Sequence, residues 1–223
     1  MESQFLFFDI ETTGLIKAKK HDIDFRKSEQ FPHIVQLSWQ LVSYDHDSKI
    51  FTNKTNVDYI IRPKDYTIPP DSSKIHGITQ EIADSRGIDI TGALENFMTD
   101  LTKHNNTYLV CHNIEFDVTI LFYHIYKNFQ NRFVSYKDKQ IPCVCTMLDT
   151  VSLCKLPSMS KFKNPNDPYK YPKLSELYKC LFGNEPTGRL HNSMYDVECM
   201  IECFKELMNR KLLTVRNANL VFE

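Results

Sequence analysis

The chain has 223 residues, of which 42% are hydrophobic and 25% charged, and its formal net charge is −1. This balance fits one globular domain, or one domain with a long insertion, and it argues against a protein that coats nucleic acid through bulk electrostatics. No apolar run approaches the ~20 residues that a membrane span needs, so we expect no membrane partner.

The cysteines and the N-terminus indicate an intracellular protein. The stretch MESQFLFFDI lacks a positive n-region and a small-residue cleavage site. Seven cysteines are an odd number for a disulfide framework, so a reducing compartment, cytoplasmic or nuclear, is expected. Cys199 and Cys203 share a helical face and no second pair stands at finger spacing, so we expect no structural zinc site.

The first third of the chain predicts strands joined by loops. The run at 5–11 is short and continuously apolar, and 33–45 alternates apolar with polar residues; both patterns are typical of strands. The predicted segments are a strand at 5–11, a loop at 16–30, a strand at 33–45, a turn at 45–49, a strand at 58–63 and a loop at 66–73.

The remainder alternates helices and strands. Apolar residues recur at helical spacing in 91–104 and 114–129, and both segments are expected to be amphipathic helices. The expected helices are 79–85, 91–104, 114–129, 173–183 and 193–208; the expected strands are 107–113 and 144–150, the latter leading to a turn or helix; 158–172 reads as a loop, and the tail after Leu213 has no clear pattern. This order predicts an α/β fold with a mixed sheet.

Two carboxylates end the first predicted strand. Asp9 and Glu11 are two residues apart, so their side chains project from the same face of a strand. Like charges this close raise each other's pKa unless a cation lies between them. A D-x-E pair can also be two solvated acids at a strand end, and by itself it does not decide between these readings.

Two more acids favour a metal site. Asp117 and Asp196 each fall in the first turn of an expected helix, close to its apolar stripe. An unpaired carboxylate in such a place costs several kcal/mol, of which a helix N-terminus offsets only about 0.3–1 kcal/mol. A shared divalent cation would resolve all four acids, and ligands that are all oxygen favour Mg²⁺ or Mn²⁺.

Two histidines are treated differently. His191 stands in a flexible segment five residues before Asp196, where a side chain with a pKa of ~6.5 is suited to general-base work; the alternative is a surface histidine. His112 ends a buried strand, and we expect it to be packed and hydrogen-bonded rather than catalytic.

Four segments stand in order along the chain: FDIETTGL, IHGIT, HNIEFD and HNSMYD. Together they resemble the motifs of the DEDDh 3′→5′ exonucleases, the family of the polymerase III epsilon subunit and the three-prime repair exonucleases. The resemblance runs from about residue 5 to residue 208. It implies a single exonuclease domain over 1–223 and a ribonuclease-H-like fold, with a central five-stranded mixed sheet flanked by helices.

The resemblance also implies a role for each catalytic residue. Asp9 would bridge two Mg²⁺ (or Mn²⁺) ions, with Glu11 and Asp196 on the ion that binds the attacking water and Asp117 on the other. His191 would take the proton of that water, and the product would be a nucleoside 5′-monophosphate.

Substrate contacts follow from the same resemblance. The backbone near Thr12 and Thr13 would meet the terminal 3′-hydroxyl, and Leu15 and His76 would pack around the last base. Leu15 could instead pack in the core or at its rim, and His76 could be a loop histidine. The full implied set is Thr12, Thr13, Gly14, Leu15, His76, Asn113 and Phe116. Ser193, where the family often has alanine, could cap the last helix.

Two basic segments are possible contacts for a single strand. Lysines and aromatic residues interleave between Lys155 and Lys173, and a second basic run lies between Lys17 and Lys27. A solvated charged loop is the more common explanation of either run.

The resulting prediction is a metal-dependent 3′→5′ exonuclease of the proofreading or repair type, acting on single-stranded 3′ ends, with DNA preferred and RNA possible. A DNA polymerase or other replication or repair protein is a possible partner. Three alternatives remain: an exoribonuclease that trims RNA, a non-catalytic nucleic-acid- or polymerase-binding module, and a structural α/β domain with solvated acids. The last requires Asp196 to be exposed.

Overall fold

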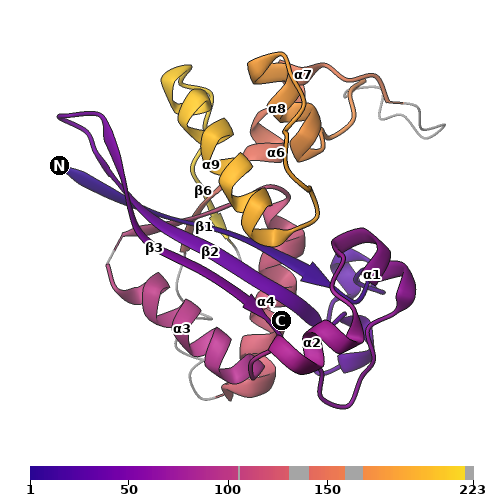
Figure 1. Ribbon diagram of the computed structural model, residues 1–223. Helices are drawn as coiled ribbons and strands as arrows, with labels where there is room; N and C mark the ends of the chain where they lie inside the picture. Colours follow the sequence, from indigo (N-terminus) through magenta and orange to yellow (C-terminus); the bar gives the residue numbers. More distant parts are fainter. Residues whose placement is uncertain (105, 131–140, 159–167, 219–223) are drawn as a thin grey trace.

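The computed structural model describes all residues except 105, 131–140, 159–167 and 219–223. Its elements follow the expected strand-rich first part and mixed second part (Figure 1). The strands are β1 (Glu2–Thr12), β2 (Ile34–Asp45), β3 (Ile50–Ile60), β4 (Thr107–Cys111), β5 (Ile141–Cys145) and β6 (Arg216–Ala218). The helices are α1 (Pro70–His76), α2 (Gln80–Arg86), α3 (Ile90–Thr102), α4 (Ile114–Asn128), α6 (Thr146–Asp149), α7 (Val151–Cys154), α8 (Leu174–Phe182) and α9 (Ser193–Asn209), with single 3₁₀ turns η1 (Lys20–Asp22) and η2 (Ser28–Gln30).

The strands form one mixed sheet in the order β3-β2-β1-β4-β5-β6. β1 pairs antiparallel with β2 and parallel with β4, and β5 pairs parallel with β4. The predicted α/β class and five-stranded mixed sheet are confirmed, and the short β6 adds a sixth strand antiparallel to β5. That strand comes from the tail after Leu213, for which the sequence pattern predicted no structure.

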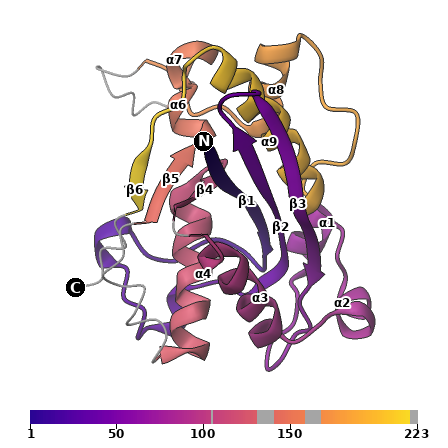
Figure 2. The same cartoon turned by 90° about the vertical axis from the view of Figure 1, so that its left-hand side faces the viewer.

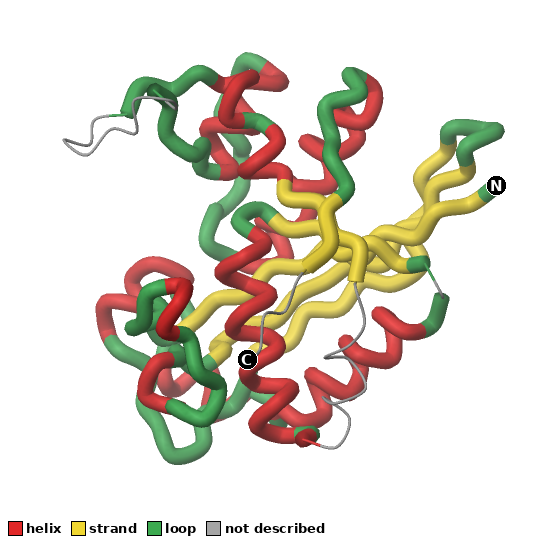
Figure 3. The backbone as a smooth tube through the Cα atoms, turned by 180° about the vertical axis from the view of Figure 1, so that it is seen from behind, coloured by secondary structure: helices red, strands yellow, loops and turns green. Residues whose placement is uncertain are grey.

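Helices cover both faces of the sheet. Figures 2 and 3 show α3 and α4 on one face, and Figure 1 places α8 and α9 on the other. Alternate residues of β1 explain this layering, because successive side chains of a strand point to opposite faces. Leu6 and Phe8 pack with Phe97 of α3, whereas Phe5 and Phe7 pack edge-to-face against Phe204 of α9.

The structure corrects three boundaries. β3 extends over Ile50–Ile60 rather than 58–63; its first half is polar and exposed, so it gave no apolar signal. Part of the expected loop at 66–73 is helical, because Pro70 opens α1 at a position that tolerates a missing backbone N–H. Ser193 does not cap α9: the Asn192 side chain accepts the Tyr195 N–H, and Ser193 is the first helical residue.

Two further expectations concern the loops and helices. Residues 158 and 168–172 contain no helix, but the centre of that loop, with Lys161 and Lys163, lies outside the described residues. Within the part of the chain that the structure describes, no helix has both the length and the apolar character needed to cross a membrane.

Candidate active site

The site forms where β1 continues past Phe7, the last of its residues that pairs with β4. Asp9 and Glu11 lie on the same face of β1 as Phe5 and Phe7, the residues that pack against α9. Asp196 lies in the first turn of α9, so packing of this helix on β1 brings its N-terminus to the two strand acids. The predicted common face of Asp9 and Glu11 is therefore turned toward Asp196.

Asp117 approaches from α4, after the chain turns at the end of β4. The turn requires Asn113 in a left-handed conformation, with φ of +83°, immediately before the helix. The Asp117 side chain is only 4% exposed and accepts hydrogen bonds from the Cys111 thiol, at 3.1 Å, and from the Ile10 backbone N–H. These bonds hold a buried carboxylate next to β1.

The four acids influence one another's protonation. Burial is the largest cause that raises the pKa of Asp9 well above its usual range, and the charges of the other three acids add to it. Burial likewise raises the pKa of Glu11 to about 8 and the pKa values of Asp117 and Asp196 to about 7. Carboxyl groups in this state need either protons or a cation, as expected from their clustering.

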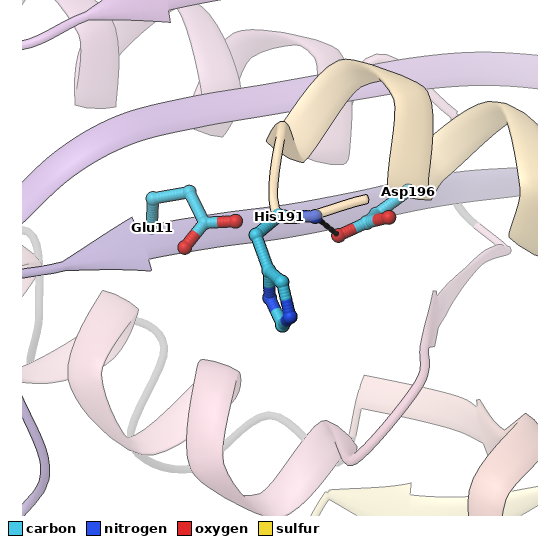
Figure 4. A group of neighbouring side chains, drawn as sticks. All are labelled: Glu11, His191 and Asp196. Atoms are coloured by element: carbon cyan, nitrogen blue, oxygen red, sulfur yellow. Dashed lines mark hydrogen bonds between the residues drawn. The ribbon is translucent and has the colours of Figure 1, made fainter. Parts of the chain in front are cut away.

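Glu11, His191 and Asp196 present a candidate metal group. One ligand atom from each residue lies within 4.8 Å of the other two (Figure 4). In Figure 4 the two carboxylates lie on opposite sides of His191, whose ring points downward, away from its backbone. The His191 backbone N–H donates to Asp196 Oδ2 at 3.0 Å, which fixes one oxygen of that carboxylate.

The donor set fits a hard divalent cation. Asp196 Oδ1 is buried and has no hydrogen-bond partner among the described residues, so a ligand position stands free inside the cluster. The reading with solvated acids required an exposed Asp196 and is contradicted by this burial. Carboxylate oxygens are the ligands that Mg²⁺ and Mn²⁺ prefer. Asp9 and Asp117 are not members of this 4.8 Å group. The charge of Asp196 nevertheless raises the pKa values of both, so they lie close enough to interact with it.

His191 is exposed on the segment between α8 and α9, as expected for a side chain that can move. Its φ of +61° is in the left-handed region, which is uncommon for residues other than glycine. His112 is held on both sides, since Nδ1 bonds Thr146 Oγ1 and Nε2 bonds the Pro172 carbonyl, each at 2.9 Å. The prediction of a packed, hydrogen-bonded His112 is confirmed.

The substrate residues implied by the resemblance differ in their exposure and in their contacts with the rest of the protein. Thr13 is engaged by the protein: its N–H donates to the His33 carbonyl, and its carbonyl accepts from Ser72 Oγ at 2.9 Å. Leu15 is 75% exposed, which excludes the core-packing alternative.

The remaining implied residues are less exposed. His76 is buried in the last turn of α1 and is not a loop histidine. Thr12 and Gly14 follow the acids at the end of β1, where Thr12 Oγ1 donates to the Gly14 carbonyl at 2.7 Å. Phe116 lies in the first turn of α4, next to Asp117, and packs against the core.

Some supporting contacts could not be found from sequence. Ser193 Oγ donates to the Asp9 carbonyl at 2.6 Å, and the Ser193 N–H donates to Gln36 Oε1 at 3.2 Å. These bonds join the start of α9 directly to β1 and β2. Arg189, two residues before His191, places its guanidinium against Gly77 at the end of α1. Its only signal in the sequence was a basic residue close to a catalytic motif.

The chain was compared with proteins of known structure. E. coli exonuclease I in complex with a dT13 oligonucleotide matches with a TM-score of 0.67 and 22% identity over 94% of this chain and 42% of that one. The complex with dA16 gives 0.66 and 21% over 94% and 42%, and a zinc-bound complex with single-stranded DNA gives 0.66 and 20% over 95% and 41%. The chain thus spans less than half the length of these proteins, and the likeness confirms the ribonuclease-H-like fold.

A sequence search of the curated proteins found no match. The family model described as "Exonuclease", of the ribonuclease T type, matches residues 6–204. Enzymes of this family depend on divalent metal ions, in keeping with the acidic cluster. Since the match covers most of the 223 residues and all four motifs, the chain belongs to the exonuclease family, whose DEDDh branch its motifs resemble.

Proposed function

We propose that this protein is a 3′→5′ exonuclease that releases nucleoside 5′-monophosphates from single-stranded 3′ ends, with DNA as the preferred substrate. The observation that supports it best is the convergence of four coupled acids with an exposed histidine at the end of β1. The oligonucleotides bound to the matched exonuclease I structures support single-stranded DNA as the substrate class.

In this proposal the metal ligands are Asp9, Glu11, Asp117 and Asp196, which would hold two Mg²⁺ or Mn²⁺ ions. When bound, such ions activate water and stabilise charge on the transferred phosphoryl group and the leaving 3′-oxygen. The protein's own contributions are separate. Asp117 is fixed by Cys111 and Ile10, and Asp196 by the His191 backbone, so the ligand oxygens are pre-oriented.

His191 is the proposed general base. His191 is exposed, and one of its ring nitrogens lies within 4.8 Å of a carboxylate oxygen of Glu11 and of Asp196. It can therefore take a proton from the attacking water and release it to solvent. Leu15 and His76 would contact the terminal nucleotide, with Thr12 near the 3′-hydroxyl. Further contacts are proposed from Thr13, Gly14, Asn113 and Phe116.

We also propose that residues 1–223 form a single exonuclease domain with its core at about 5–208. A polymerase partner has no support among the matched structures and is not part of the proposal.

The proposal is tested with matched 5′-labelled substrates: single-stranded DNA, duplex DNA, mismatched duplex and single-stranded RNA, each with Mg²⁺ and with chelator. We expect stepwise shortening of single-stranded DNA from its 3′ end, release of 5′-mononucleotides, and no reaction with chelator. Faster shortening of RNA would favour the exoribonuclease. Binding without any shortening would favour the non-catalytic module.

A further inference from the structure

Arg189 is held at the active site by an unusually close contact. Its guanidinium lies directly on Gly77, where an added Cβ would be 2.3 Å from Nη2 and 2.5 Å from Nη1. Gly77 ends α1 with φ of +80°, so glycine is favoured there both by its backbone conformation and by the approach of the arginine. The contact places a permanent positive charge beside the last turn of α1.

A buried donor without an acceptor lies next to this charge. His76 precedes Gly77 and is 4% exposed. Its Nδ1 accepts the Ile78 N–H at 3.1 Å, so in the neutral ring the proton resides on Nε2. That Nε2 is buried and finds no acceptor within the described part of the chain. Burial, and then the charges of Arg189 and His191, lower the pKa of His76, which keeps the ring neutral.

None of the described acidic residues explains why the Arg189 guanidinium lies at this position. Among the described residues, no carboxylate forms an ion pair with Arg189, although Glu11 and Asp196 lie close to His191, two residues further along the chain. The exposed Arg189 guanidinium and the buried imidazole N–H of His76 are both donors, and neither has an acceptor among the described residues. An anionic oxygen brought from outside the protein would satisfy both.

We propose that Arg189, together with the Nε2–H of His76, binds a phosphate of the substrate strand near its 3′ end, beside the metal-binding acids. The guanidinium can offer two parallel N–H donors to one phosphate, a geometry that lysine lacks. This inference rests on the proposed nuclease function and adds a phosphate contact to it.

The test compares Arg189→Ala and Arg189→Lys with a control, Arg210→Ala. Arg210 is an exposed arginine at the other end of α9, paired only with Glu206 among the described residues. We expect Arg189→Ala to raise the KM for a single-stranded oligonucleotide about tenfold or more, and to reduce the slope of log affinity against log salt by about 0.7. Arg189→Lys should restore the slope but only part of the affinity. The control should match the wild type.

Substrates with one neutral methylphosphonate, at each of the three terminal linkages in turn, identify the phosphate. At one linkage the substitution should weaken wild-type binding and have no further effect on Arg189→Ala. Additive losses at all three linkages would overturn the proposal. The proposal would also be overturned if Arg189→Ala and the control had the same slope of log affinity against log salt. This holds even if Arg189→Ala lowers the melting temperature or the metal affinity. Failure of the wild type to bind or cleave any oligonucleotide would instead refute the nuclease function itself.

Discussion

At the scale of single residues, the site is built from groups that are unfavourable until a cation joins them. Asp9, Glu11, Asp117 and Asp196 all have raised pKa values, and burial is the main cause in each case. The protein thus gives up stability in its metal-free form in order to hold ligand oxygens in place. Neutralising one acid should therefore separate stability from activity.

Asp9→Asn tests this separation. The amide keeps the shape of the side chain but removes the charge that the other three acids repel, so the metal-free protein should gain about 1 kcal/mol or more in free energy of unfolding. Cleavage should fall at least about a hundredfold, because several kcal/mol of transition-state stabilisation depend on the metal ligands. Chemical denaturation with chelator and a single-turnover assay with Mg²⁺ measure the two effects. A variant that retains full activity would remove Asp9 from the site.

His191→Ala separates the base from the ligands. The exposed imidazole contributes little to folding, so the melting temperature should stay close to that of the wild type. Loss of a general base should slow cleavage by about 10²–10⁴-fold. Calorimetric titration with Mn²⁺ provides the check, with metal affinity expected to remain nearly unchanged. Loss of metal binding would mean that His191 is a ligand, as its distance from Glu11 and Asp196 also permits.

At the scale of elements, helix α9 positions one wall of the site. The Phe204 ring of this helix packs edge-to-face on Phe5 and on Phe7, with 4.9 Å between ring centroids in both pairs. Ser193, at the other end of the helix, donates to the Asp9 carbonyl. Packing at one end and a hydrogen bond at the other thus fix the direction in which Asp196 points.

Phe204→Ala should be strongly destabilising, because removal of a fully buried ring leaves a cavity between α9 and the sheet. The expected loss is about 3–5 kcal/mol in the free energy of unfolding. Phe182→Ala on α8 is the matched control, because that ring is 39% exposed and its loss should cost no more than about 0.5 kcal/mol. Urea denaturation of both variants gives the comparison, and equal losses would contradict this account of the packing.

Much of this architecture was predictable from the sequence. Apolar runs located β1 and β2, which are buried on both faces, and helical spacing located α3, α4 and α9, each of which buries one continuous face. The motifs located all four acids and His191. The sequence pattern did not predict α1, since Pro69 and Pro70 are typical of a loop, nor the first half of β3, where Asn53 and Lys54 are exposed. The contact of Arg189 with Gly77 joins segments more than a hundred residues apart and has no local signal.

At the scale of the whole molecule, stability should depend on pH in an uncommon direction. Between about pH 6.5 and about pH 8, the raised carboxyl pKa values mean that the folded protein holds protons that the unfolded chain has released. Below this window His112 and His124 act in the opposite sense, because burial lowers their pKa values to about 4 and about 3 and only the unfolded chain protonates them. By linkage, the free energy of unfolding of the metal-free protein should fall as pH rises through this window.

Saturating Mg²⁺ should reverse that trend, since the cation replaces the protons and binds only the folded state. Melting temperatures measured from pH 6.5 to pH 8, with chelator and with Mg²⁺, test both statements. The Asp196→Asn variant should show a shallower fall. A chelated wild type that becomes more stable toward pH 8 would show that these acids are ionised and separately solvated.

The central claim is that acids from β1, α4 and α9 share divalent cations in one site. The most direct measurement is an anomalous difference map from crystals soaked in Mn²⁺ with a 3′-terminal oligonucleotide. We predict two peaks about 3.5–4 Å apart, ligated by Asp9, Glu11, Asp117 and Asp196. A map without anomalous density at these four residues, in crystals that show the oligonucleotide, would contradict the account.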